Sequence, residues 1–225
     1  MSAASVPAAL GLRAVRGGGV GVAVAMDGEA PRVVLSTFLA TAAAGDRLAF
    51  EPYHVAYEME RGPQGEVSAQ AAAAVAEGRR RQEAVAASGL AGLVGALKDA
   101  GCKPGVVALL VNRAGWMTDL LEHSLAAPEH PPVAEGLAVR VALRFACRRC
   151  GLPVVEMDEK SLPELASAVL SLSPPGLDAR LKAFGAAVGR PWRKEQKIAC
   201  LSAWMALVAS RRTDADGGDS RSLES

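Results

Sequence analysis

The chain has few aromatic residues, few cysteines and almost no net charge, and each shortage excludes a class of protein. Aromatic side chains make up 4% of the 225 residues, so alanine, valine and leucine must fill most of the interior. The formal net charge of +1 means that a polyanion can be bound only by local clusters of positive charge. The cysteines are too few and too scattered for a disulfide framework and predict reduced thiols in a cytoplasmic protein: Cys102, Cys147, Cys150 and Cys200.

Long apolar segments are also missing. No run approaches the roughly 20 apolar residues needed to cross a bilayer, so no membrane contact is expected. Arg13 and Arg16 precede the short run Val20–Met26, an arrangement that superficially resembles a secretory signal. The run is short and follows three glycines, so a strand is the better interpretation. Half of the residues are apolar, and a chain of this length predicts one domain.

The first part of the chain has the pattern of strands. Within Val20–Met26, bulky and small side chains alternate, which is the period-two pattern of a strand. The turn residues Asp27 and Gly28 separate this strand from the run Val33–Thr41, so we expect a hairpin. Leu48–Met59 is interpreted as a third extended segment, which would complete three antiparallel strands.

The rest of the chain alternates helical and extended patterns. Glu66–Ala100 is rich in alanine with helical spacing, and a break is expected at Ser88-Gly89. Val106–Val111 is a continuous apolar run, typical of a parallel strand covered on both faces. Two further helices are predicted at Pro131–Cys150 and Trp192–Arg211, with a short strand between them at Pro153–Met157.

The predicted architecture is an α/β domain with a central mixed five-stranded sheet, three antiparallel strands followed by two parallel ones, flanked by helices. We assign residues 1–11 to a flexible leader, 12–211 to a single domain and 212–225 to a disordered tail.

This order of elements resembles the ribonuclease H-like superfamily, particularly its Holliday-junction-resolvase branch. The resemblance covers roughly residues 12–210. It is carried by the glycine-rich segment 17–24, the apolar strand that ends in Leu110-Val111-Asn112, the segment Gly136–Met157 and the closing helix Lys194–Ala209.

The resemblance implies a nuclease that uses two divalent metals, Mg²⁺ or Mn²⁺, and no organic cofactor. It also implies an aspartate on the first strand, an acid at the tip of the fourth and further acids on the last helix. Here Arg16 and glycines stand where the first aspartate is expected, and the fourth strand ends in Asn112-Arg113. The middle of the last helix carries Ala199, Ser202 and Trp204.

Two hypotheses follow from these departures. The chain is either a divergent metal-dependent nuclease or a binding or assembly module that has lost its acids. A third, an actin-like nucleotide-binding protein, needs two such domains, and this chain has room for one.

The candidate catalytic acids are Glu58, Glu135 and Glu195, with Glu58 and Glu135 as metal ligands. Glu58 is selected because it lies on an otherwise apolar segment, next to His54. For Glu135 an alternative is equally good, because an acid near Pro131-Pro132 also suits the start of a helix.

The candidate nucleic-acid-binding residues are basic. Arg140, Arg144 and Arg148 recur every four residues and therefore share one helix face, while Lys194 and Lys197 begin the last helix. Arg16 precedes glycines that let backbone amides approach a phosphate. A solvated helix face and simple close packing are the alternative interpretations. The expected partner is DNA or RNA, with a homodimer as an open option.

Overall fold

The computed structural model describes residues 5–59, 61–62, 65–112 and 119–219, with side chains described as far as Thr213. In chain order the elements are β1 (Val6–Val15), β2 (Gly18–Asp27), β3 (Ala30–Ala40), α1 (Arg47–Phe50), α2 (Pro52–Tyr57), α3 (Ala69–Asp99), β4 (Cys102–Val111), α4 (Leu120–Ala126), α5 (Pro131–Arg149), β5 (Val154–Asp158), α6 (Leu162–Leu170), α7 (Pro174–Val188) and α8 (Lys194–Asp219).

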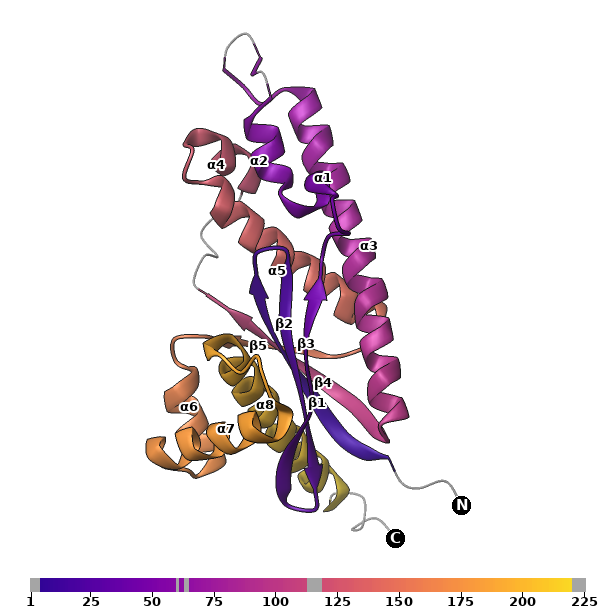
Figure 1. Cartoon of the computed structure of the whole chain (residues 1–225), viewed down its shortest axis with the longest axis vertical. Coiled ribbons are helices and arrows are strands. Elements are labelled where there is room, and N and C mark those ends of the chain that lie inside the picture. Colours follow the sequence, from indigo (N-terminus) through magenta and orange to yellow (C-terminus); the bar gives the residue numbers. More distant parts are fainter. Residues whose placement is uncertain (1–4, 60, 63–64, 113–118, 220–225) are drawn as a thin grey trace.

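The strands form one mixed sheet in the order β3-β2-β1-β4-β5 (Figure 1). β1 pairs antiparallel with β2 and β2 with β3, whereas β4 runs parallel to β1 and β5 parallel to β4. The predicted mixed five-stranded sheet is therefore confirmed. Because of these directions, β1, β3, β4 and β5 all end on the same side, at Val15, Ala40, Val111 and Asp158, which we call the carboxyl end of the sheet.

The first strand lies earlier than the sequence pattern predicts. β1 begins at Val6, so residues 6–11 belong to the sheet and the prediction of a flexible leader is wrong for them. Leu10 and Leu12 are at most 1% exposed, because β1 is the central strand and is covered on both faces. Such a strand shows no alternation of apolar and polar residues, so the period-two pattern misses it. The glycine-rich segment is the second strand, β2.

The prediction of a third strand at Leu48–Met59 is also wrong, because this segment folds as α1 and α2. The side chain of Asp46 caps the start of α1, and Pro52 occupies the first turn of α2. Tyr53 and Ala56 are both buried, three residues apart on one side of α2. Both helices are too short to display a helical period in the sequence.

The long predicted helices are confirmed, with two differences. α3 continues through Ser88 and Gly89 without the expected break. α8 reaches Asp219, so the tail predicted from residue 212 is helical to that point, and residues 220–225 lie outside the described part. Extending a packed helix is far easier than nucleating a new one, which explains why this polar end stays helical. No helix of the described residues is long and apolar enough to span a bilayer.

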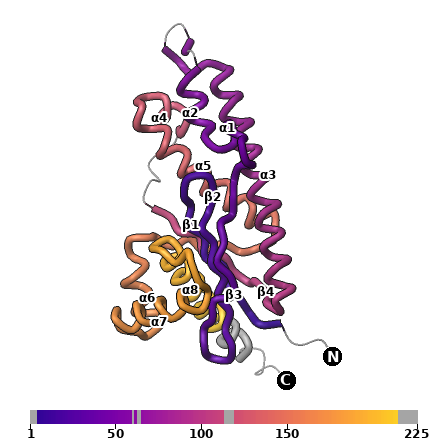
Figure 2. Tube along the Cα trace, in the orientation of Figure 1, coloured from indigo at the N-terminus to yellow at the C-terminus, as the bar shows by residue number. Residues whose placement is uncertain are grey.

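Helices cover both faces of the sheet (Figure 2). α3 and α5 pack on the face that contains Leu10 and Leu109, which we call the α5 face. α8, with α6 and α7, packs on the opposite face, called the α8 face. A Cβ added to Gly11 would lie 1.8 Å from the carbonyl oxygen of Ala199, so this glycine allows α8 to lie directly on β1.

A smaller core lies beyond the carboxyl end of the sheet. There α1, α2 and α4 meet the adjoining turns of α3 and α5 (Figure 1). Tyr53 and Leu125 are buried in this core together with Ala71 and Ala138. The carboxyl end of the sheet therefore lies between the two large cores and this helical extension.

Candidate functional site

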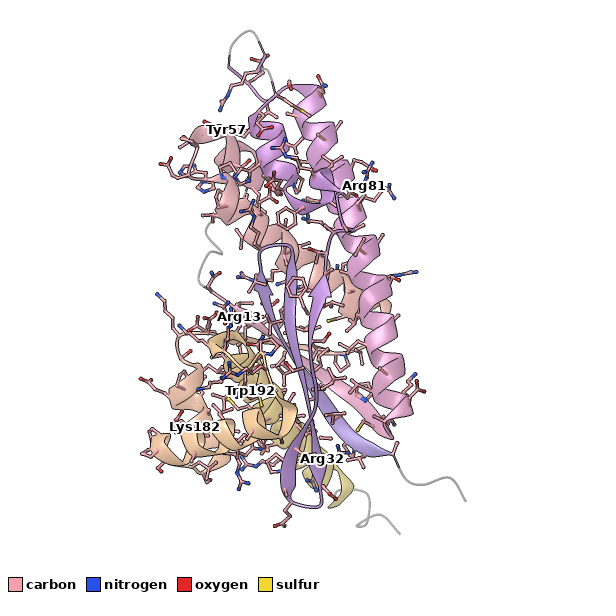
Figure 3. All side chains as sticks on the ribbon, viewed as in Figure 1. Arg13, Arg32, Tyr57, Arg81, Lys182 and Trp192 are labelled. Carbon is pink, nitrogen blue, oxygen red and sulfur yellow. The ribbon has the colours of Figure 1, made fainter. Side chains whose placement is uncertain are left out.

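Arg13 is the only charged side chain on β1 and lies on the α8 face near the carboxyl end of the sheet (Figure 3). Its Nε donates to Oε2 of Glu159 and its Nη2 to Oε1 of the same carboxylate, both at 3.0 Å. Its Nη1 lies 4.0 Å from Oε1 of Glu195 at the start of α8. One guanidinium thus joins β1, the residue that follows β5, and α8.

The Arg13–Glu159 pair is partly shielded from water. The two side chains are 24% and 26% exposed. The backbone N–H of Glu159 also donates to the carbonyl of Val111, which extends the pairing of β5 with β4. A two-donor contact between guanidinium and carboxylate is stronger and more directional than a single charged hydrogen bond. This group is consequently a fixed part of the carboxyl end.

The residues at this position do not fit the metal pair that the resemblance implies. β1 offers Arg13 and no acid, β4 leads into Asn112, and α8 presents Ala199 and Ser202 to β1. Divalent metals of this kind need several oxygen ligands, and a guanidinium at the same place repels them. Among the described residues, no group of three or more His, Cys, Asp or Glu side chains is arranged to hold a metal.

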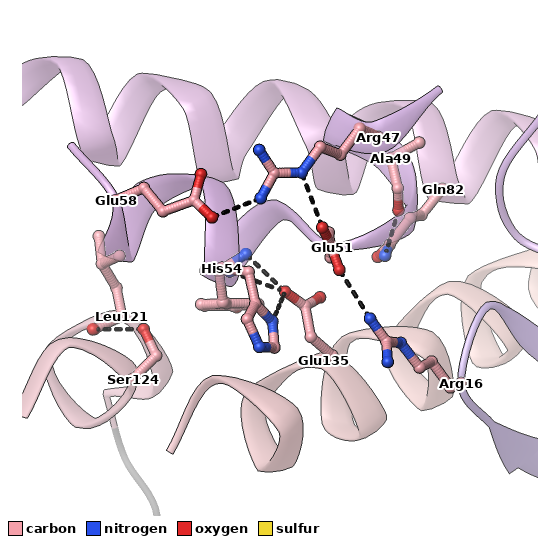
Figure 4. Close-up of polar contacts among 11 residues, drawn as sticks. Arg16, Arg47, Ala49, Glu51, His54, Glu58, Gln82, Leu121, Ser124 and Glu135 are labelled. Atoms are coloured by element: carbon pink, nitrogen blue, oxygen red, sulfur yellow. Dashed lines mark hydrogen bonds and ion pairs between the residues drawn. The ribbon is translucent and has the colours of Figure 1, made fainter. Parts of the chain in front are cut away.

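The three predicted catalytic acids lie in different places, and Figure 4 shows two of them, Glu58 and Glu135. Glu58 follows the last residue of α2 and pairs with Arg47. Glu135, on α5, contacts the opposite end of α2. Glu195 lies beside Arg13 at the start of α8. The contacts do not bring the three carboxylates to one point. Their catalytic role, and metal binding by Glu58 and Glu135, stay predictions without a shared geometry.

Glu135 caps α2 from a neighbouring helix. Its Oε1 accepts the backbone N–H groups of Tyr53 at 2.7 Å and His54 at 3.1 Å. The residue is 3% exposed, and within the described part of the chain its Oε2 has no hydrogen-bond partner. Burial raises the pKa of Glu135 to about 7, although the two N–H donors act in the opposite direction. Sequence reasoning anticipates a helix-start role for Glu135, but on its own helix and not on α2.

The predicted arginine face of α5 runs from the end of β4 back along β5. Arg140 donates to Oδ1 of Asn112 at 2.6 Å, and Nε of Arg144 donates to Oε1 of Glu156 at 2.8 Å. Arg148 is exposed. Partial burial lowers the pKa of Arg140. The three arginines therefore follow the β5 side of the sheet on the α5 face.

The remaining predicted basic residues lie near the same end of the sheet. Lys194 and Lys197 border an apolar hollow of about 680 Å³ between α6, α7 and α8, next to Trp192 (Figure 3). Arg16 forms the turn between β1 and β2 and pairs with Glu51 at 2.7 Å. Of the predicted basic residues, Arg16, Arg140 and Lys194 therefore lie near the carboxyl end, on different faces, whereas Arg144 and Arg148 follow α5 back toward the start of β5.

The Cys147–Cys150 spacing serves packing. Cys147 is buried against the α5 face of the sheet, and burial raises its pKa to about 12. A thiol that stays protonated at neutral pH is a poor metal ligand and a poor nucleophile. This burial agrees with the sequence interpretation of the pair as packing residues.

Sequence reasoning missed Arg13 and Glu159. The sequence pattern places the first strand at the glycine-rich segment, which is β2, so it aligns Arg16 and not Arg13 with the expected aspartate. One signal was present, since Arg13 is the only charge in the ten residues from Val6 to Val15. An isolated charge in an apolar stretch indicates either a paired or a functional group.

The fold is of the ribonuclease H-like class, with three antiparallel strands followed by two parallel ones. The chain is similar to the structure of Thermus thermophilus RuvC, with a TM-score of 0.51 and 10% identity over 92% of this chain and 96% of that one. It is equally similar to T. thermophilus RuvC in complex with a Holliday junction substrate, with a TM-score of 0.52, 11% identity and the same coverage.

The yeast mitochondrial Holliday junction resolvase Ydc2 is a more distant match, with a TM-score of 0.42 and 12% identity over 89% of this chain and 78% of that one. No family model and no curated protein matches the sequence. At these identities the similarity to RuvC establishes the fold.

Proposed function

We propose that this protein is a non-catalytic ribonuclease H-like module that binds DNA or RNA at the carboxyl end of its sheet. The Arg13–Glu159 pair carries the proposal, because a guanidinium already bound to a carboxylate occupies the place where the resemblance calls for a metal-binding acid. Ligands of open α/β sheets generally bind at the carboxyl ends of the strands. One similar RuvC structure contains a Holliday junction substrate, which supports a nucleic acid as the partner.

The phosphate contacts are assigned to the arginine face of α5, with Lys194 and Lys197 adding charge on the other face. Arg144 and Arg148 are the most suitable, because Arg148 is exposed and the Arg144 partner, Glu156, is itself 42% exposed. An exposed carboxylate is a weak competitor for a guanidinium, and a phosphate can bind the same fork of donors. Because the net charge is only +1, these local clusters must supply the attraction.

The test measures binding to branched, single-stranded and double-stranded substrates by fluorescence anisotropy, between about 50 and 200 mM salt. We expect salt-sensitive binding. If all three α5 arginines contact phosphates, replacing Arg140, Arg144 and Arg148 with Ala lowers the slope of log affinity against log salt by about three.

A matched control removes three exposed cations from other helices, namely Arg80, Arg180 and Lys182. This variant should bind like the unmodified chain. Equal weakening in both variants, or binding that ignores salt, would contradict the assignment. Strand cleavage in the presence of Mg²⁺ or Mn²⁺ would overturn the non-catalytic proposal in favour of the nuclease hypothesis, and Glu58, Glu135 and Glu195 would then be the first residues to replace.

A further inference from the structure

A second binding feature lies at the carboxyl end of the sheet, on the side of β3. A surface hollow of about 450 Å³ separates the β1–β2 turn from α1. Its lining includes Arg16, Gly17, Phe38, Arg47 and Phe50, and we call it the Phe38–Phe50 hollow. None of these residues belongs to the arginine face of α5.

Two exposed aromatic rings line this hollow. Phe38 is 53% and Phe50 37% exposed, in a chain that has only four phenylalanines. Burying a phenylalanine side chain lowers the free energy, so two rings left exposed in one hollow indicate a binding surface. Base–aromatic stacking makes use of such rings and tolerates any base, because every base has a π-face.

Two consecutive glycines make room for the rings. A Cβ added to Gly17 would lie 2.5 Å from Cε2 of Phe50, and one added to Gly18 would lie 2.7 Å from Cζ of Phe38. Gly17 also has a φ of +77°, a left-handed conformation that favours glycine. The glycine-rich segment that the sequence singled out therefore shapes the hollow as well as the sheet.

Charged side chains of both signs accompany the rings, since Arg16 and Arg47 share the lining of the hollow with Asp46. Cζ of Arg16 lies 5.1 Å from the centre of the Phe50 ring, and the Arg16 side chain is 65% exposed. Within the described residues Arg16 commits one nitrogen to a hydrogen bond, the 2.7 Å contact with Glu51 (Figure 4). An arginine has five N–H donors, so others are available to an incoming oxygen. Arg47 lines the same hollow and binds Glu51 through Nε and Glu58 through Nη2, so a phosphate would have to use its remaining N–H donors.

The hollow is close to Arg13. Phe38 pairs with Val20 and Val20 with Arg13, so the three residues form one row across β3, β2 and β1. Neighbouring strands are about 4.8 Å apart, so Phe38 lies only about 10 Å from Arg13 along this row. The whole sheet spans about 19 Å from β3 to β5, which one nucleic-acid strand can cross.

We propose that the Phe38–Phe50 hollow binds an unpaired nucleotide of a nucleic-acid strand. The base stacks on Phe38 and Phe50, and the adjoining phosphate accepts hydrogen bonds from Arg16 and Arg47. This rests on the proposed function and adds the kind of substrate: strands with unpaired bases are preferred to continuous duplex, whose bases have no free face. A free nucleotide shares the same chemistry, so the test must separate it from a strand.

The test uses a single-stranded oligonucleotide with one 2-aminopurine, the same oligonucleotide annealed to its complement, and AMP alone. Stacking should quench the 2-aminopurine fluorescence of the single strand. Phe38→Ala and Phe50→Ala should each weaken single-strand binding by roughly tenfold, as expected for the loss of one stacked base, and change duplex binding by less than about twofold. Phe38→Trp should retain both affinity and quenching.

Matched controls lie outside the hollow. Tyr57→Ala removes an aromatic ring that is 37% exposed, as Phe50 is, and should leave single-strand binding unchanged. Arg16→Ala should weaken binding and reduce its salt dependence, whereas Arg80→Ala should not, although Arg80 is similarly exposed and also paired with a glutamate.

The outcomes separate the two proposals. Two results would overturn the assignment of the hollow as a nucleotide site and leave the proposed function standing. One is salt-sensitive binding without a preference for unpaired strands, and the other is salt-sensitive binding that the phenylalanine variants do not change. Binding of AMP as tight as that of the oligonucleotide would overturn the assignment to a strand. The absence of binding to any of the oligonucleotides would overturn both.

Discussion

Arg13 and Arg16 are three residues apart around the end of β1, and both meet glutamates, but in different surroundings. Arg13 is 24% exposed and holds Glu159 through two nitrogens, whereas Arg16 is 65% exposed and meets Glu51 through one. Shielding makes the first pair strong and fixed, while water and salt weaken the second. The carboxyl end therefore combines a rigid group on the α8 face with an adaptable group at the turn.

The largest expected effect concerns the backbone contact that holds α8 beside Arg13. Gly11→Ala would put a Cβ 1.8 Å from the carbonyl oxygen of Ala199, and α8 must move away from β1 to accept it. We expect a loss of at least about 3 kcal/mol in the free energy of unfolding, measured with a chemical denaturant.

The control is Gly136→Ala on α5, where an added Cβ meets nothing within 4 Å. This change should be neutral or stabilise the protein by up to about 1 kcal/mol, because alanine is the better helix former. If the two variants were equally stable, the close contact at Gly11 would not fix the position of α8. The rigidity of the Arg13–Glu159 pair could then not be attributed to that contact.

The second prediction concerns Glu135, which lies near the adaptable group but is itself buried. Its pKa is raised from 4.5 to about 7, so the folded state favours the protonated carboxyl. The stabilising contribution of this group is complete below about pH 4.5 and is lost as the pH rises through 7, a change of about 3 kcal/mol.

Glu135→Gln keeps an oxygen for the N–H groups of Tyr53 and His54 and removes the buried charge. We therefore expect the variant to be more stable than the unmodified chain above pH 7 by up to about 3 kcal/mol, and about equal to it near pH 4.5. Denaturant curves recorded across this pH range check the prediction. A stability difference that does not vary with pH would show that folding leaves the pKa of Glu135 unshifted.

The third and smallest effect compares the two kinds of arginine–glutamate pair directly. Glu159→Gln leaves the partly buried Arg13 with a weaker partner and should cost about 2 kcal/mol, between the values for buried and exposed pairs. Glu58→Gln, which removes one of the two carboxylates that pair with the exposed Arg47, should leave the unfolding midpoint unchanged. Equal effects in the two variants would remove the distinction between the partly buried and the exposed arginine–glutamate pairs.

The sheet and the long helices were predictable because their patterns are local. The apolar run at β4 and the helical spacing of the alanine-rich segment that forms α3 can be read directly from the chain. β1 could not be predicted, because a central strand is apolar on both faces and its segment Ala8–Leu12 shows no alternation of apolar and polar residues. α1 and α2 could not be predicted either, since each is shorter than two turns.

The site was harder to predict than the fold because its contacts join distant parts of the chain. Arg13 and Glu159 are 146 residues apart, and no pattern in either neighbourhood indicates that they meet. Glu135 was identified as a helix-start acid, yet the helix that it caps lies about 80 residues earlier, at Tyr53 and His54. The arginine spacing on α5 was visible, whereas its position beside β5 depends on the tertiary fold.

The buried cysteines give the two helical layers separate chemical reporters. Cys147 belongs to α5 and Cys200 to α8, both are buried, and burial raises the pKa of each thiol to about 12. At neutral pH almost none of either thiol is the reactive thiolate while its layer is closed. The rate at which each cysteine is alkylated therefore measures how often its own layer opens, so mass spectrometry can tell whether the α5 or the α8 side of the sheet detaches first.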